Sequence, residues 1–152
     1  MLKIDLICIS RLKKGAYADL IKTYERRINW PLKIIELESK HNDPVKCQQD
    51  ENEKILKHIN KDSVLIACDE KGKSFPSIKF SQKLQNYSLD GMAHIQFVIG
   101  GADGLMNDVK KQSDLLLSFG VQTWPHALAR VMLLEQIYRS QQILAGHPYH
   151  RE

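Results

Sequence analysis

The chain has 152 residues, of which 43% are hydrophobic and 26% are charged. This length and composition fit one globular domain, residues 1–152, and exclude a disordered chain. Lysine and arginine outnumber aspartate and glutamate by 22 to 18, and the resulting net charge of +4 is compatible either with a nucleic-acid partner or with a plain solvated surface.

The three cysteines form no CxxC pair, so we expect neither a disulfide framework nor a zinc ribbon, and a reducing compartment. The apolar stretch at the N-terminus is too short for a secretion signal. No run approaches the roughly 20 apolar residues that a membrane-spanning helix needs. We therefore expect a cytoplasmic protein with no membrane partner.

Strand and helix patterns alternate along the chain. In chain order we expect a strand at 2–9, a helix at 17–28, a strand at 32–37, a helix at 44–59, a strand at 63–68, a helix at 77–87, a strand at 94–99, a helix at 107–112, a strand at 115–118 and a helix at 126–144. Asp43 and Pro44 predict the N-cap and first position of the second helix. Residues 69–73 are expected to form a polar loop. This alternation predicts an α/β fold with a mostly parallel sheet and helices on both faces.

The first connection and the first helix carry the densest basic cluster of the chain. Its members are Arg11, Lys13, Lys14, Lys22, Arg26 and Arg27. A solvated helix face and a patch that contacts phosphates explain this cluster equally well.

Three expected strand ends carry loops that suggest a ligand site: the segment from Cys68-Asp69 onward and the glycine-containing loops after the strands at 94–99 and 115–118. In parallel sheets, ligands bind beyond the carboxyl ends of the strands, and glycines let the backbone approach a ligand closely. The sequence GGADG at 100–104 does not match GxGxxG and follows the fourth strand, which disfavours a nucleotide-dependent oxidoreductase. A tight structural turn remains the alternative for this loop taken alone.

The last helix is apolar around nearly its whole circumference, which predicts burial between the sheet and a second subunit. Its charged residues need partners or a ligand, because burying an unpaired charge is costly. They are His126, Arg130, Glu135 and Arg139. Two interpretations remain open for Glu135 and Arg139: a structural i,i+4 pair, or a pair that approaches the partner's site. If the two residues merely pair with each other, their catalytic assignment fails.

The C-terminal tail contains Tyr149, His150 and Arg151, which are suited to stacking on a base or gripping a phosphate. A frayed terminus without function is the alternative. His147 and His150 lack a third ligand with convincing spacing, so we expect no metal site.

Three segments together carry a resemblance to a known family. The segments are FVIGGADG, LSFGVQTWPHALARVMLLEQIYR and the terminal HPYHRE. Their combination resembles the RlmH family of large-subunit ribosomal RNA methyltransferases, and the similarity extends over the whole chain in length and element order. The resemblance implies a SPOUT fold with a C-terminal trefoil knot, a homodimer, and a ribosomal RNA or whole-ribosome substrate.

The resemblance also implies S-adenosylmethionine as cofactor and methyl transfer to N3 of a pseudouridine. The cofactor-binding positions carried over from the family are Cys68, Gly100, Phe119, Gly120, Val121, Gln122, Thr123 and Trp124. Cys68 stands where an apolar residue such as leucine is usual in the family, so its contact is expected through packing or backbone. A catalytically inactive RNA-binding module with the same fold is the alternative function.

The chemistry of such a transfer requires help with the N3 proton. Methyl transfer in line relies mainly on positioning, and the imide N3–H must lose its proton as the new bond forms. The groups that can assist are His126, Glu135 and His150, and the sequence does not choose among them. Arg130, Arg139 and Arg151 can stabilise the developing negative charge or hold phosphates, and Tyr149 completes the expected catalytic set.

Overall fold

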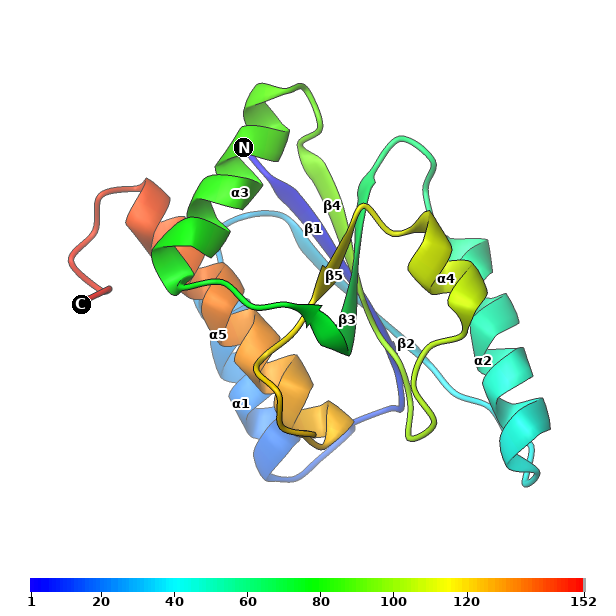
Figure 1. Cartoon of the computed structure of the whole chain (residues 1–152). Coiled ribbons are helices and arrows are strands. Elements are labelled where there is room, and N and C mark those ends of the chain that lie inside the picture. The colour runs from blue at the N-terminus through cyan, green and yellow to red at the C-terminus, as the bar shows by residue number, and fades with distance from the viewer. Residues whose placement is uncertain (152) are drawn as a thin grey trace.

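Five parallel strands run through the centre of the computed structural model, which describes residues 1–151 (Figure 1). The strands are β1 (Lys3–Ile9), β2 (Leu32–Leu37), β3 (Val64–Lys73), β4 (His94–Ile99) and β5 (Leu115–Leu117). Their order in the sheet is β2-β1-β4-β3-β5. The expected parallel sheet is confirmed, and the last residue of the expected domain, Glu152, lies outside the described residues.

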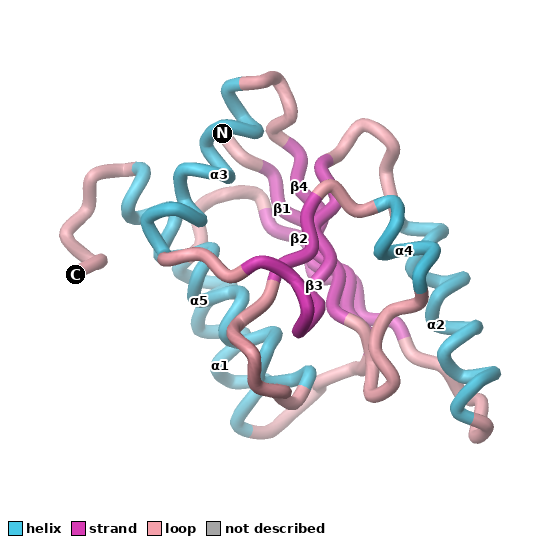
Figure 2. The backbone as a smooth tube through the Cα atoms, viewed as in Figure 1, coloured by secondary structure: helices cyan, strands magenta, loops and turns pink. Residues whose placement is uncertain are grey.

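Helices cover both faces of the sheet, as the alternating pattern predicts (Figures 1 and 2). They are α1 (Ala16–Arg27), α2 (Pro44–His58), α3 (Ser77–Leu89), α4 (Asn107–Gln112) and α5 (His126–Leu144). Successive strand side chains alternate between the faces. Leu6 and Phe97 therefore join the core beneath α1, α3 and α5, whereas Ile7 and Val98 join the core beneath α2 and α4.

The start of α2 follows its sequence prediction. The Asp43 carboxylate accepts a hydrogen bond of 3.0 Å from the backbone N–H of Lys46, and Pro44 occupies the first helical position. A side-chain acceptor at the N-cap satisfies one of the backbone donors that a helix leaves free at its start.

The prediction of a loop at 69–73 is wrong, because β3 continues to Lys73. Cys68 and Lys73 both pair with Leu117, so the residues between them bulge out of the ladder and the strand curls at its end (Figure 2). A Cβ atom at Gly72 would lie only 2.5 Å from the carbonyl oxygen of Leu116. The glycine is therefore needed for close approach of two backbones, a contact between distant segments that local polarity does not indicate.

The last helix, α5, lies on the sheet between α1 and α3 (Figure 1). Every residue from His126 to Leu144 is buried or half-buried in the single chain. The trefoil knot and the second subunit stay predictions, because strand pairing and burial within one chain test neither. None of the helices within residues 1–151 is long and apolar enough to cross a membrane.

Candidate functional site

A cleft of about 820 Å³ opens where the carboxyl ends of β3, β4 and β5 meet. Its walls come from residues 68–71, 99–105 and the segment that follows β5. Seven of the eight expected cofactor-binding residues line it, namely Cys68, Gly100, Phe119, Gly120, Gln122, Thr123 and Trp124. Val121 does not line the cleft, and the residue is 98% exposed. The structure thus brings most of the expected set together, and their role in binding a cofactor stays a prediction.

The segment after β5 is folded tightly on itself. The Ser118 hydroxyl accepts from the Gly120 N–H at 3.1 Å, and the Trp124 indole N–H donates to the Phe119 carbonyl at 3.3 Å. Thr123 donates to the Glu70 carboxylate at 2.7 Å, which links this segment to the curled end of β3. These bonds place the two aromatic rings, Phe119 and Trp124, in the wall of the cleft.

The cleft also has a charged wall at the strand end from Cys68-Asp69 onward, which was among the expected ligand loops, although its pairing with Lys110 was not expected. The Lys110 ammonium lies 3.4 Å from the Asp69 carboxylate, and both residues line the cleft together with Glu70. Asp69 and Glu70 come directly after a buried apolar run, where parallel strands present their carboxyl ends, whereas Lys110 lies on α4 and reaches Asp69 from a distant segment.

Cys68 lines the cleft as a neutral thiol. Burial raises the pKa of its thiol to about 12, because the charged thiolate is poorly solvated away from water. The side chain therefore behaves as a small apolar group near neutral pH, which agrees with the expectation of a packing contact.

Four expected catalytic residues meet at the C-terminal half of α5. The Glu135 carboxylate accepts from Arg139 Nε at 2.7 Å and from the Tyr149 hydroxyl at 3.0 Å. Arg139 Nη1 lies 3.1 Å from Nδ1 of His150, and the guanidinium stacks 4.7 Å from the centre of the Tyr149 ring. The i,i+4 pair forms, and it also holds the tail. We call these four residues the tail cluster.

Burial and the bond to Glu135 both raise the pKa of Tyr149, so its hydroxyl stays protonated and donates. The Tyr149 ring packs edge-on against Tyr138 at 4.8 Å, and Tyr138 lies 6.3 Å from the ring of Tyr24. The Arg27 guanidinium lies 5.7 Å from the centre of the Tyr24 ring and 5.9 Å from the centre of the Tyr138 ring. Aromatic rings and arginines therefore form one continuous surface beside the tail cluster.

Arg130 lies in neither the cleft wall nor the tail cluster. It is 1% exposed, and its guanidinium donates to the Glu36 carboxylate at 2.6 Å and to the Ser10 carbonyl at 2.8 Å. Ser10 has φ +95°, a strained conformation for a residue with a side chain. Burial alone would raise the pKa of Glu36, but the Leu12 N–H and Arg130 outweigh it and hold that pKa below its usual value.

His126 begins α5 and lines the cleft, and its Nδ1 atom is buried without a hydrogen-bond partner.

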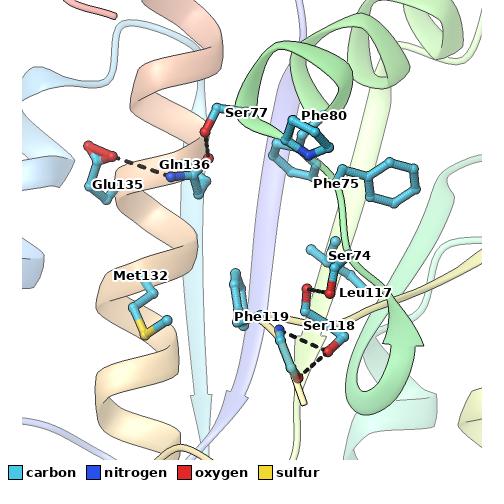
Figure 3. Close-up of a pocket in the computed structure, with 12 residues that line it drawn as sticks. Ser74, Phe75, Ser77, Phe80, Leu117, Ser118, Phe119, Met132, Glu135 and Gln136 are labelled. Carbon is cyan, nitrogen blue, oxygen red and sulfur yellow. Dashed lines mark hydrogen bonds between the residues drawn. The ribbon is translucent and has the colours of Figure 1, made fainter. Parts of the chain in front are cut away.

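A second cavity, of about 470 Å³, lies between the start of α3 and the middle of α5 (Figure 3). Phe119 and Gly120 line both cavities, and Glu135 lines the second one while belonging to the tail cluster. Among residues 1–151, no three His, Cys, Asp or Glu side chains are grouped as a metal site would require.

Comparison with known proteins identifies similar sequences over the whole chain. The family model described as "Predicted SPOUT methyltransferase" matches residues 2–150. A protein of Rhodospirillum centenum is 43% identical over 151 residues, 99% of each chain, and one of Zymomonas mobilis is 38% identical over the same share. Both are named "Ribosomal RNA large subunit methyltransferase H".

Two solved structures share the fold at low sequence identity. A probable methylase family protein from Haemophilus influenzae matches with a TM-score of 0.61 at 14% identity, over 100% of this chain and 72% of that one. The SpoU methyltransferase AviRb from Streptomyces viridochromogenes, solved in complex with AdoMet, matches with a TM-score of 0.51 at 16% identity. The match covers 93% of this chain and 58% of that one.

Proposed function

The chain belongs to the SPOUT methyltransferase family, and from this premise we propose that it transfers a methyl group from S-adenosylmethionine to N3 of a pseudouridine in large-subunit ribosomal RNA. The names of its full-length relatives support the RNA substrate. The observation that carries the proposal is the cleft, which collects seven of the eight expected cofactor-binding residues at the carboxyl edge of a parallel sheet.

The residues present in the cleft fit S-adenosylmethionine. A volume of about 820 Å³ lies within the usual range for sites of small molecules and cofactors. Phe119 and Trp124 offer aromatic faces for the adenine, and the orphan Nδ1 of His126 is a buried polar atom that lacks a partner. When bound, S-adenosylmethionine supplies an electrophilic methyl group on its sulfonium sulfur.

The tail cluster is the part of the chain suited to proton handling. Glu135 and His150 of the tail cluster, together with His126 in the cleft, are the groups that can accept the N3 proton, and Arg139 can stabilise the negative charge that develops on the imide. The contacts of Glu135 with Arg139 and Tyr149 fix the carboxylate in one orientation, which an acceptor of a specific proton requires. We assign Arg130 to positioning α5, because both of its terminal nitrogens are occupied by Glu36 and Ser10.

A homodimer would bring a cleft and a tail cluster together. Ala129 lines the cleft and Arg139 lies ten residues further along α5, a separation of about 15 Å at the helical rise. Beside α5, helix α1 exposes Tyr17 by 38% and Leu20 by 44%, which supplies apolar surface for a partner. A second copy that packs against α1 and α5 can place its own tail cluster at the cleft.

Mixing two inactive variants tests this arrangement. Gly100→Arg blocks the cleft and Glu135→Gln removes a candidate proton acceptor, so each homodimer should be inactive. If each site combines two chains, a co-expressed mixture should regain about a quarter of the wild-type rate, because half of the dimers then contain one intact site. Confirmed heterodimers without activity would contradict the shared site.

The basic cluster is the proposed contact with the ribosomal RNA backbone, in the cytoplasm and on the assembled ribosome. Arg11, Lys13 and Lys14 are exposed in the connection before α1, and Arg26 and Arg27 are exposed at its end. Arg27 also lies over the Tyr24 and Tyr138 rings, so the basic and aromatic surfaces are continuous. Such a combination suits phosphates and unstacked bases together.

The deciding experiment is methyl transfer to ribosomes from a strain that lacks the gene, followed by mass spectrometry of the ribosomal RNA. We expect one methylated pseudouridine with the wild-type chain and none with Gly100→Arg. An RNA-binding module without catalysis would instead associate with ribosomes and leave the RNA unmethylated. Absence of S-adenosylmethionine binding by the wild-type chain would overturn the proposal.

A further inference from the structure

Helix α2 contacts the Gly100–Gly104 loop from outside the cleft. The Gln48 side-chain amide donates to the carbonyl oxygen of Asp103 at 3.0 Å and lies 3.4 Å from that of Gly104. Gln48 does not line the cleft, whereas all five residues of the loop do. Asp103 lies 55 positions after Gln48 in the chain and Gly104 lies 56 positions after it, so the contact joins distant segments.

Glu51, one helical turn further along α2, lies beneath the same loop. It is 8% exposed, and its two carboxylate oxygens lie 2.9 Å and 3.1 Å from the position of a Cβ atom at Gly101. Cys47 contacts one of these oxygens at 3.7 Å. Burial raises the pKa of Glu51, because the charged carboxylate is poorly solvated there. The carboxylate therefore limits how far Gly101 can move toward α2.

The loop needs such support because of its composition. Three of its five residues are glycines, whose backbones lose the most conformational freedom on ordering. Its internal bond runs from the Gly104 N–H to the Gly101 carbonyl at 3.0 Å. Gly104 has φ +75°, and a Cβ at Gly100 would lie 2.9 Å from the Gly104 carbonyl carbon, so the turn tolerates little change of shape.

We propose that Gln48, supported by Glu51, is a positioning residue for cofactor binding: it holds the Gly100–Gly104 loop in the shape that forms one wall of the cleft. This inference rests on the proposed function, because it assumes that S-adenosylmethionine binds there. If the loop is already ordered before the cofactor binds, binding does not include the loss of conformational entropy that ordering the loop would cost. The loss of Gln48 should therefore weaken cofactor affinity and leave the rate at saturating cofactor nearly unchanged.

The experiment compares three variants with the full-length wild-type chain. Gln48→Met keeps the length of the side chain and removes the donor, whereas Gln48→Lys keeps a donor. Gln49→Met is the matched control, because Gln49 is the next residue of α2, is exposed and has no hydrogen bond to the loop. The measurements are the dissociation constant for S-adenosylmethionine by titration calorimetry, and kcat and KM for methyl transfer.

We expect Gln48→Met to raise the dissociation constant and the KM for S-adenosylmethionine about fivefold, the usual effect of one lost hydrogen bond, with kcat changed less than about twofold. Gln48→Lys should recover part of the affinity, and Gln49→Met should match the wild type. Amide hydrogen exchange gives a second measurement, in which Gln48→Met should speed exchange at 101–105 and leave β4 protected.

Equal affinities of Gln48→Met and the wild type would overturn the positioning role and leave the proposed function intact. Failure of the wild-type chain to bind S-adenosylmethionine would overturn both. If Gln48→Met proved unstable, faster exchange throughout β4 would assign Gln48 to general stability and would also overturn the proposal.

Discussion

The two halves of α5 each carry an arginine paired with a carboxylate, and the two pairs differ in the exposure of the arginine and in the sequence distance to its partners. Arg130 is 1% exposed, and its partners lie 94 and 120 residues away. The Arg139 side chain is 24% exposed, and its partners, Glu135 and His150, lie 4 and 11 residues away. Arg130 thus connects distant parts of the fold, whereas Arg139 orders a local group at the surface.

This difference distinguishes, within one helix, an arginine that stabilises the fold from an arginine that can act on a substrate. A buried arginine with both terminal nitrogens occupied has little capacity left for a substrate, and its removal leaves its partners unsatisfied. A partly exposed arginine gains little stability from its pair and remains reachable by a substrate. The same substitution should therefore affect stability in one half and activity in the other.

The largest effect is expected for Arg130→Met. It leaves the Glu36 carboxylate and the Ser10 carbonyl without their cationic partner. Because Arg130 is buried and the Glu36 side chain is 28% exposed, the loss should be about 2 kcal/mol of unfolding free energy, between the values for exposed and buried pairs. Urea denaturation measures the loss, with Arg139→Met as control. A loss below about 1 kcal/mol would show that the two halves do not differ in this respect.

Arg139→Met should lower kcat about 100-fold while reducing the unfolding free energy by less than about 1 kcal/mol. The reason is that Arg139 holds both Glu135 and His150, and it is the candidate for stabilising charge on the imide. Methyl-transfer kinetics on ribosomes measure the effect at saturating cofactor. A variant with unchanged kcat would remove the tail cluster from the catalytic assignment.

Tyr149→Phe should have a smaller effect, with kcat lowered about fivefold. It removes the hydroxyl that donates to Glu135 at 3.0 Å and keeps the ring that stacks on Arg139 and Tyr138. The ring contacts should keep the tail in place, so the unfolding free energy should match that of the wild type. If kcat instead fell as far as in Arg139→Met, the hydroxyl itself would take part in the chemistry.

The smallest effect concerns acid stability. The folded-state pKa of Glu36 lies below its ordinary value of 4.5, so its ionised form contributes stability above that pH and loses it as the pH falls through the lowered pKa. Arg130→Met removes part of that lowering. The stability difference between wild type and Arg130→Met should therefore shrink below about pH 4.5. Urea midpoints measured at several pH values test this, and a difference that does not change with pH would contradict it.

Local patterns were enough to predict most elements of the fold. The periodicity placed the helices at 107–112 and 126–144 and the strands at 32–37 and 94–99 within a residue of their observed bounds. Asp43 marked the start of α2 because capping is a local interaction. The expected cofactor-binding residues came from the resemblance, and the position of their segments at strand ends explains why they share one cleft.

These local patterns could not predict contacts between segments that are distant in the sequence. The extension of β3 depends on the close approach of Gly72 to the backbone of Leu116, and the partners of Arg130 lie on β2 and after β1. Gln48 was missed because α2 is a charged helix in which one more polar residue gives no signal. Only its place one turn before the buried Glu51 distinguishes it, and that burial is a property of the fold.

The two contacts of Arg130 have different consequences for the substitutions that evolution can accept at positions 10 and 36. Glu36 offers a side chain, which a mutation can delete, whereas Ser10 offers a backbone carbonyl, which every residue type possesses. Selection on this part of the fold should therefore couple positions 36 and 130, so that they change together or not at all. Position 10 should vary independently of both, with glycine the easiest replacement at its positive φ.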